Sequence, residues 1–162
     1  MDETASPYRY RSEFGPHLMM DCQECDLEKI SSLSYVYEFI NNLPDQIGMT
    51  KITQPYVFPY EGIVPEDKGI TASVIIAESH LTFHSFTEKD YFFFDLFSCK
   101  PFDVDAVKRL VIDSFSVRKA DTFVQHRGLD FPRSVISQPK TNPAVLNIDT
   151  TRRSSVLTGT SF

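Results

Sequence analysis

The stretch from Ile70 to Phe97, ITASVIIAESHLTFHSFTEKDYFFFDLF, decides the fold. Its first part, residues 70–77, is almost continuously apolar, which predicts a central strand covered on both faces. Residues 80–86 alternate well enough to predict the next strand. Residues 91–97 predict another, because aromatic side chains favour strands and three phenylalanines follow one another there.

Before this stretch, the sequence predicts a strand, a helix and a weaker strand. Residues 17–22 are a short apolar run typical of a strand. Asp26 is expected to cap a helix that ends before Pro44. The apolar stripe of that helix is expected to consist of Leu27, Ile30, Leu33, Tyr37 and Ile40. Residues 51–58 favour an edge or interrupted strand, because Pro55 has no amide hydrogen to donate.

After the stretch, Asp103 is expected to cap a second helix. Its stripe consists of Val104, Val107, Leu110 and Val111. Residues 122–124 predict a last short strand. Strands interrupted by two helices in this order predict an α+β fold, a two-layer sandwich with helices on one face of a mostly antiparallel sheet.

Charge and composition exclude several classes of protein. Sixteen basic and 22 acidic residues give a formal net charge of −6, which lacks the basic field that phosphate backbones attract, so nucleic acid is not an expected partner. No stretch approaches the roughly 20 apolar residues of a membrane helix, and the N-terminus lacks an export signal. We therefore expect a cytoplasmic protein with no membrane partner and reduced cysteines.

The densest polar cluster on these strands is Glu78-Ser79-His80, followed by His84 and, after the next strand, Cys99. Residue types alone leave two interpretations open. Either Ser79 and His80 form an ordinary turn and Cys99 is a small buried side chain, or the reactive groups share a site. Spacing alone does not place these residues in one catalytic triad, because Ser79 and His84 would point to opposite faces of a strand.

Cys22 and Cys25 have C-x-x-C spacing. A structural zinc site needs four ligands, and no second paired motif completes one, so we expect no metal. A redox role like that of thioredoxin fits the position of the pair between a strand and a helix, but the flanking residues give it no other support. The redox role stays the weaker alternative.

Residues 77–84, Ala-Glu-Ser-His-Leu-Thr-Phe-His, and 94–99, Phe-Asp-Leu-Phe-Ser-Cys, resemble the short bacterial and archaeal S-adenosylmethionine decarboxylases, which are pyruvoyl enzymes. Other matches lie at Gly15-x-His17-Leu18, Glu24-Cys25-Asp26, Gly69-Ile70-Thr71, Asp103-Val104-Asp105 and His126-Arg127-Gly128. We therefore assign residues 14–133 to a pyruvoyl-dependent decarboxylase domain. Polar composition predicts a flexible N-terminal arm at 1–13 and a flexible C-terminal tail at 134–162.

The resemblance implies a proenzyme that cuts itself between Glu78 and Ser79. The Ser79 hydroxyl would attack the Glu78 carbonyl, and His84 matches the base that then removes the Cα proton so that elimination cleaves the chain. What remains of Ser79 becomes the pyruvoyl cofactor. Thr71 stands where the family usually has a serine that assists processing, so a hydroxyl is retained.

In the mature enzymes of this family, the pyruvoyl carbonyl forms a Schiff base with the substrate's amino group and accepts electrons as carbon dioxide leaves. Cys99 matches the proton donor. Short family members are dimers with active sites near the subunit interface. The resemblance therefore implies a homodimer of cleaved, two-chain protomers.

Two departures from the family concern the substrate. The family's His-Thr-Trp-Pro-Glu is here His84-Ser85-Phe86-Thr87-Glu88, so a smaller ring, Phe86, precedes Glu88 in the expected binding site. Val57 aligns with the family phenylalanine that stacks on the adenine ring, and Phe58 is one position away. An insertion at roughly residues 61–68 leaves the sequence alignment open between these two residues.

The first hypothesis is therefore decarboxylation of S-adenosylmethionine for spermidine and other polyamine synthesis. One alternative keeps the mechanism and takes a basic amino acid, L-arginine or L-ornithine, as substrate. Another is a non-catalytic regulatory homologue.

Overall fold

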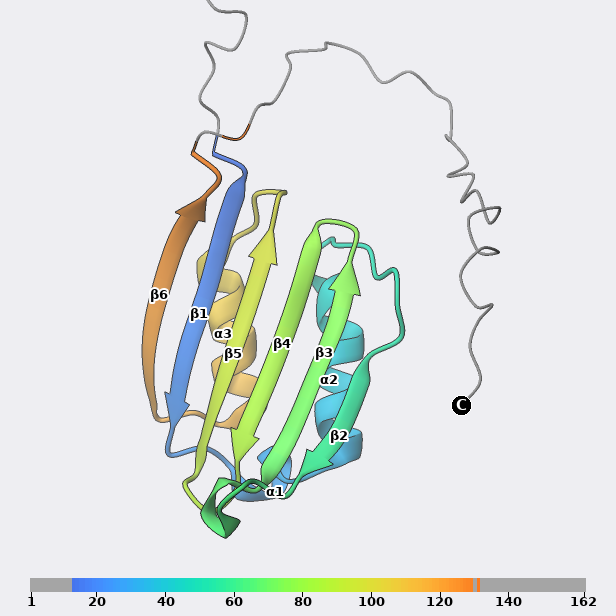
Figure 1. The fold of residues 1–162 in the computed structure, drawn as a ribbon. Helices are drawn as coiled ribbons and strands as arrows, with labels where there is room; N and C mark the ends of the chain where they lie inside the picture. Colours follow the sequence, from blue (N-terminus) through green and yellow to red (C-terminus); the bar gives the residue numbers. More distant parts are fainter. Residues whose placement is uncertain (1–12, 130, 132–162) are drawn as a thin grey trace, which may run out of the picture.

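The computed structural model describes residues 13–129 and 131. These residues form one six-stranded antiparallel sheet with strand order β2-β3-β4-β5-β1-β6 and helices against one face (Figure 1). This arrangement confirms the predicted α+β two-layer sandwich. The expected arm, apart from Glu13, and the expected tail lie outside the described residues.

The strands are β1 Gly15–Gln23, β2 Tyr56–Tyr60, β3 Gly69–Ile76, β4 Ser79–Phe86, β5 Tyr91–Ser98 and β6 Lys119–Arg127. The helices are α1 Leu27–Ile30, α2 Leu33–Gln46 and α3 Val104–Phe115, with a 3-10 helix, η1, at Pro65–Asp67. Within the described ranges, no helix is long and apolar enough to cross a membrane.

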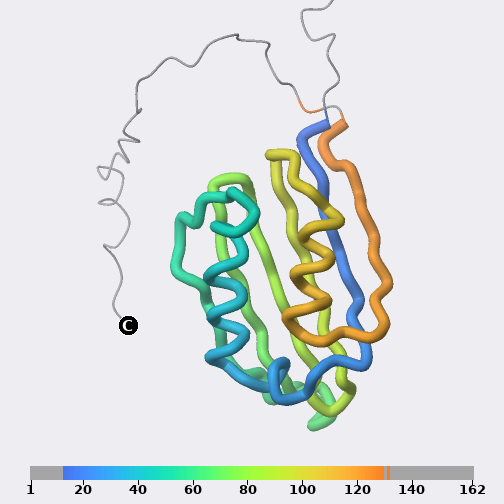
Figure 2. The backbone as a smooth tube through the Cα atoms, turned by 180° about the vertical axis from the view of Figure 1, so that it is seen from behind, coloured from blue at the N-terminus to red at the C-terminus, as the bar shows by residue number. Residues whose placement is uncertain are grey.

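The core lies between the sheet and the helices. Seen from behind, α2 and α3 run side by side across the sheet (Figure 2). Phe115 of α3 is fully buried, and its ring centroid lies 5.1 Å from that of Phe83 and 4.9 Å from that of Phe92. Each such buried ring contributes about 1.5–3 kcal/mol through burial alone, so this aromatic group fastens α3 to β4 and β5.

On the other face of the sheet, called the open face below, the described residues place no helix. The prediction that residues 70–77 are covered on both faces is wrong: buried and more exposed residues alternate along β3, and the outward Ile75 is 42% exposed. The sequence misleads here because β-branched residues occupy both faces of this strand. The open face therefore presents side chains that a helix layer would otherwise cover.

The single helix expected after Asp26 is two helices. Asp26 caps α1, as predicted, but the Ser32 hydroxyl accepts a hydrogen bond from the Tyr35 amide and begins α2. The expected stripe is wrong in part, because Leu27, Leu33 and Tyr37 are exposed while the buried residues of α2 are Val36, Ile40, Leu43 and Pro44. The helix also continues past Pro44 to Gln46, since a proline so near its end disturbs little of the helix beyond it.

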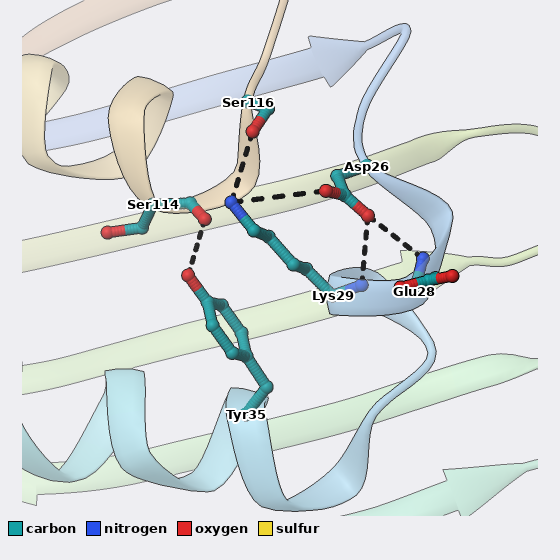
Figure 3. A network of polar contacts seen from close by, with 6 residues as sticks. All are labelled: Asp26, Glu28, Lys29, Tyr35, Ser114 and Ser116. Atoms are coloured by element: carbon teal, nitrogen blue, oxygen red, sulfur yellow. Dashed lines mark hydrogen bonds and ion pairs between the residues drawn. The ribbon is translucent and has the colours of Figure 1, made fainter.

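A polar network joins α1 and α2 to the end of α3 (Figure 3). One Asp26 carboxylate oxygen accepts from the amides of Glu28 and Lys29, and the Lys29 ammonium donates to the Ser116 hydroxyl at 3.0 Å. Tyr35 donates its hydroxyl hydrogen to the Ser114 carbonyl at 2.6 Å. The network therefore links α2 to the end of α3, the two helices that cover the sheet.

The edge strands differ in length from the predictions. Residues 51–58 were predicted as an edge or interrupted strand: β2 is indeed at an edge but starts only at Tyr56, and Lys51 makes one isolated bridge to Ile76. The last strand runs over Lys119–Arg127, nine residues instead of three, because it pairs with the whole of β1.

Candidate functional site

The candidate residues lie in two groups at opposite ends of β4. The Ser79 cluster consists of Glu78, Ser79, His80 and Cys99, at the β3–β4 turn and the end of β5. The His84 cluster consists of Thr71, His84, Phe86 and Tyr60, toward the β4–β5 turn. Figure 1 shows these two turns at opposite ends of the sheet.

In the Ser79 cluster, hydrogen bonds anchor the Glu78 side of the peptide between Glu78 and Ser79. The Glu78 carbonyl accepts a hydrogen bond from the Cys99 amide at 2.9 Å, and the Glu78 carboxylate accepts from the Thr50 amide at 3.1 Å. The Ala77 amide donates to the Thr50 carbonyl at 2.8 Å. These hydrogen bonds hold the turn between β3 and β4 against neighbouring segments. The Cys99 amide also polarises the Glu78 carbonyl.

The Ser79 hydroxyl contacts the side chain that follows it. Its Oγ lies 3.1 Å from Nδ1 of His80, within hydrogen-bond distance. The His80 ring is on the open face, where its centroid lies 5.8 Å from that of Phe97 and 6.3 Å from that of His17. The parity of a strand places Ser79 and His80 on opposite faces, and the position of Ser79 at the very start of β4 is what lets the two groups meet.

Cys99 follows β5 and lines a cavity of about 390 Å³. Gly15 lets β1 approach the backbone next to Cys99 closely. A Cβ atom on residue 15 would lie only 1.8 Å from the Ser98 carbonyl oxygen. The cavity wall is mainly apolar and includes Phe14 and Phe102. Sequence analysis did not single out these two rings, since only their place beside Cys99 connects them with the site.

In the His84 cluster, Thr71 and His84 are register partners on β3 and β4. Thr71 Oγ1 lies 2.6 Å from His84 Nδ1. When Nδ1 carries the hydrogen and donates to Thr71, Nε2 is left free to accept a proton. Burial lowers the pKa of His84 below 6.5, opposed by the charge of Asp67, so the ring is mostly neutral at pH 7 and fit to act as a base.

The two clusters do not meet within one chain. Ser79 and His84 are five residues apart on the same extended strand, which at about 3.3 Å per residue separates their Cα atoms by roughly 16 Å. Neither side chain spans that gap. Of the expected site residues, the structure therefore brings Glu78, Ser79 and the expected proton donor Cys99 together and leaves Thr71 and His84 apart from them.

Comparisons with known proteins agree with this fold. The family model for S-adenosylmethionine decarboxylase matches residues 16–128. The chain belongs to this family.

A Clostridium botulinum protein named S-adenosylmethionine decarboxylase proenzyme is 27% identical over 108 residues, which cover 66% of this chain and 88% of that protein. A proenzyme of the same name from Thermotoga petrophila is 32% identical over 96 residues, covering 58% and 67% of the two chains. The crystal structure of the adenosylmethionine decarboxylase from Aquifex aeolicus has a TM-score of 0.60 at 22% identity and covers 70% of this chain and 89% of that one. The last likeness concerns the fold alone. As a family member, the chain is a decarboxylase, a lyase of the pyruvoyl-dependent class.

Among the residues expected to bind substrate in this family, Phe58 and Phe86 are on the open face with His84. The His84 and Phe86 ring centroids are 4.7 Å apart, and Phe58 is the register partner of Thr71. Val57 instead packs against the hydrophobic core, so of these two expected residues only Phe58 lies on the open face. Glu88, in the β4–β5 turn, pairs with Lys68 at 2.5 Å.

The C-x-x-C pair lies in the hydrophobic core. Cys22 and Cys25 are both buried in the core, and burial raises the pKa of both thiols, that of Cys25 to about 12. A buried thiol with a raised pKa is a poor nucleophile. The structure thus contradicts the redox alternative, because the pair serves packing.

Sequence analysis missed a charged group beside His80. His17 Nε2 is buried and lies 3.5 Å from Asp95 Oδ1 without hydrogen-bond geometry, and the Arg127 guanidinium lies 4.1 Å from the centre of the Phe97 ring. Burial lowers the pKa of His17 against the opposing effect of Asp95, while Arg127 and His80 lower it further. His17 and Arg127 stand in matched motifs, but these residues come from three strands that are adjacent only after folding, so the motifs do not reveal that they meet.

Proposed function

We propose that this protein is a self-cleaving, pyruvoyl-dependent decarboxylase that converts S-adenosylmethionine to its decarboxylated form and carbon dioxide for polyamine synthesis. The observation that carries the proposal is the anchored Glu78–Ser79 peptide, whose carbonyl oxygen accepts from the Cys99 amide. A cytoplasmic location, expected from the sequence, is part of the same proposal.

Self-cleavage needs a nucleophile, a polarised carbonyl and a base. The Ser79 hydroxyl adjoins the carbonyl it would attack, and the Cys99 amide would stabilise the negative charge that develops on that oxygen. Attack forms an ester in place of the amide. Removal of the Ser79 Cα proton then expels the Glu78 carboxylate, and hydrolysis with loss of ammonia leaves a pyruvoyl group at residue 79.

The pyruvoyl group would supply an electron sink for decarboxylation. The residues present fit such a group: its carbonyl would stand at the start of β4, with the Cys99 backbone bonded to the adjoining residue and the Cys99 thiol lining the neighbouring cavity. Cys99 would return a proton to the substrate carbon after carbon dioxide leaves.

The base that completes processing is proposed to come from a second copy of this chain. His84 is roughly 16 Å from Ser79 along β4, so it cannot serve its own Ser79. The open face is rich in exposed rings, with Tyr56 66%, Phe58 49%, Phe123 52% and Phe93 39% exposed. An apolar surface of this kind favours burial against a partner. A homodimer joined through the open faces would bring the His84 cluster of one protomer to the Ser79 cluster of the other.

The rings of the His84 cluster support a nucleoside substrate. Phe58 and Phe86 are aromatic surfaces on which adenine stacks, and the Tyr60 ring lies 5.8 Å from that of His84. The alternative substrates, L-arginine or L-ornithine, have less support. Glu61, Glu66 and Glu88 line an open cavity of about 680 Å³, but Lys68 lines it as well and pairs with Glu88, while Lys89 pairs with Glu66.

The intact mass of the purified protein under denaturing conditions tests self-cleavage. We expect two fragments, residues 1–78 and 79–162, the second with a blocked N-terminus. Ser79→Ala is the matched control and should stay uncut. A wild-type chain that remains whole over days contradicts the proposal and supports the regulatory homologue.

Release of carbon dioxide from each of the three candidate substrates tests the specificity. Turnover of S-adenosylmethionine alone is expected. Turnover of only arginine or ornithine would keep the mechanism and replace the substrate. Cys99→Ala should still cut itself but lose turnover by about 100-fold or more, the usual contribution of a positioned acid.

A further inference from the structure

His80 is a titratable side chain in contact with the atom that must act as nucleophile. Its Nδ1 lies 3.1 Å from Ser79 Oγ. Serine is a weak nucleophile unless a base takes its proton. His84, the base matched by the resemblance, lies about 16 Å further along the same strand.

The His80 ring packs against neighbouring rings on the open face. His80 pairs with Phe97 on β5 and with Ile75 on β3, in the middle of the sheet. Phe97 is 8% exposed and its ring centroid lies 5.8 Å from that of His80, while the His17 ring approaches edge-on at 6.3 Å. The imidazole therefore contacts two rings on the β5 side of β4 and lies within hydrogen-bond distance of the Ser79 hydroxyl.

We propose that His80 is the base for the first step of self-cleavage, the shift of the Glu78 acyl group from the Ser79 nitrogen to the Ser79 oxygen. This inference rests on the proposed function, and it divides the chemistry of self-cleavage between two histidines. His80 serves the acyl shift within its own chain. His84 serves only the later elimination.

The step balances without any added reactant. The Ser79 hydroxyl proton moves to Nδ1 of His80, which requires the tautomer with its hydrogen on Nε2, and Oγ bonds to the Glu78 carbonyl carbon. The negative charge on the Glu78 oxygen is stabilised by the Cys99 amide, 2.9 Å away. The C–N bond then breaks, and His80 returns the proton to the Ser79 nitrogen, which leaves an ester and a free amine.

The test uses full-length chain in which His84→Ala blocks the elimination, so that processing stops at the ester. Hydroxylamine cleaves esters much faster than amides, and the appearance of residues 1–78 as a hydroxamate measures the acyl shift. In the His84→Ala background, we expect His80→Asn to slow this cleavage by about 100-fold or more. Asparagine keeps an acceptor near the position of Nδ1 but does not take up a proton at neutral pH.

Two companion variants separate basicity from packing. Thr82→Val, on the same strand and the same face two residues away, should leave the hydroxylamine rate within about twofold of the background. His80→Ala removes the ring altogether and should be as slow as His80→Asn. Circular dichroism confirms that each variant is folded, and whichever His80 variant folds decides the question.

The outcomes separate the two proposals. If the His84→Ala chain is cut by hydroxylamine and the folded His80 variants are cut equally fast, His80 is not the base while the proposed function stands. If the wild-type chain stays whole and the His84→Ala chain resists hydroxylamine, no ester forms, and the proposed function fails together with this inference.

Discussion

At the scale of single residues, Ser85 shows how one buried polar group ties layers together. It is fully buried, its hydroxyl donates to the Ile30 carbonyl at 2.9 Å, and it accepts from the Ile70 amide at 3.0 Å. It thus joins the end of α1 to the beginning of β3. Sequence analysis placed Ser85 beside His84 without a role, because a serine between aromatic residues gives no sign of its partners.

We predict that Ser85→Ala lowers the free energy of unfolding by about 1–3 kcal/mol, since it leaves two buried backbone groups without a partner. Urea unfolding on a Ser79→Ala background, which keeps the chain whole, measures the effect. Ser73→Ala, on the open face, is the control and should change stability by less than about 0.5 kcal/mol. Equal losses for the two variants would contradict the assigned role of Ser85.

His17 and His84 predict how stability depends on pH. Burial lowers the pKa of both below 6.5 in the folded chain, so the unfolded chain binds more protons between that lowered pKa and 6.5. Stability is therefore complete above about pH 6.5 and falls as the pH drops into this window.

Urea unfolding at pH 7.5 and 6.0, on the same Ser79→Ala background, measures this loss. Replacing both residues, His17→Gln and His84→Gln, should flatten the dependence. An unchanged loss of stability between the two pH values would show that other groups cause it.

At the scale of elements, the helix caps were predictable and the boundaries were less so. Asp103 caps α3 as predicted, because its carboxylate accepts from the Ala106 amide at 2.9 Å, a contact local in sequence. The break between α1 and α2 was missed, since Ser32 acts as a cap only once α2 packs through Val36 and Ile40. The one-sided cover of β3 was also missed, because apolar residues on both faces resemble a buried strand.

We predict that Asp103→Ala costs about 1 kcal/mol of stability, the usual effect of losing an N-cap. Thermal unfolding of the Ser79→Ala chain with and without this change is the measurement. Lys108→Ala removes only an exposed ion pair of the same helix and should cost no more than about 0.5 kcal/mol. A loss for Lys108→Ala as large as that for Asp103→Ala would argue against the cap.

At the scale of the whole molecule, the separation of the two clusters predicts complementation between chains. Ser79→Ala and His84→Ala chains should each stay whole when produced alone. When the two are produced together, one of the two sites in each mixed dimer combines an intact Ser79 with an intact His84 from the other chain. We therefore expect fragments whose masses match the His84→Ala chain only.

Denaturing mass measurement of the co-produced chains reads out the result. Cleavage of the His84→Ala chain on its own would show that His84 is not needed. An absence of fragments in the mixture would show that His84 acts within its own chain, against the proposed assembly.

The sequence by itself determined the α+β class, the caps Asp26 and Asp103, and the resemblance carried by residues 77–84 and 94–99, because these depend on local pattern and spacing. The tertiary structure decided which of those residues meet. It placed the Cys99 amide on the Glu78 carbonyl and His84 far from Ser79, and it turned Phe58 rather than Val57 to the open face. Strand register and the choice of covered face set these relations, and both depend on contacts between residues distant in sequence.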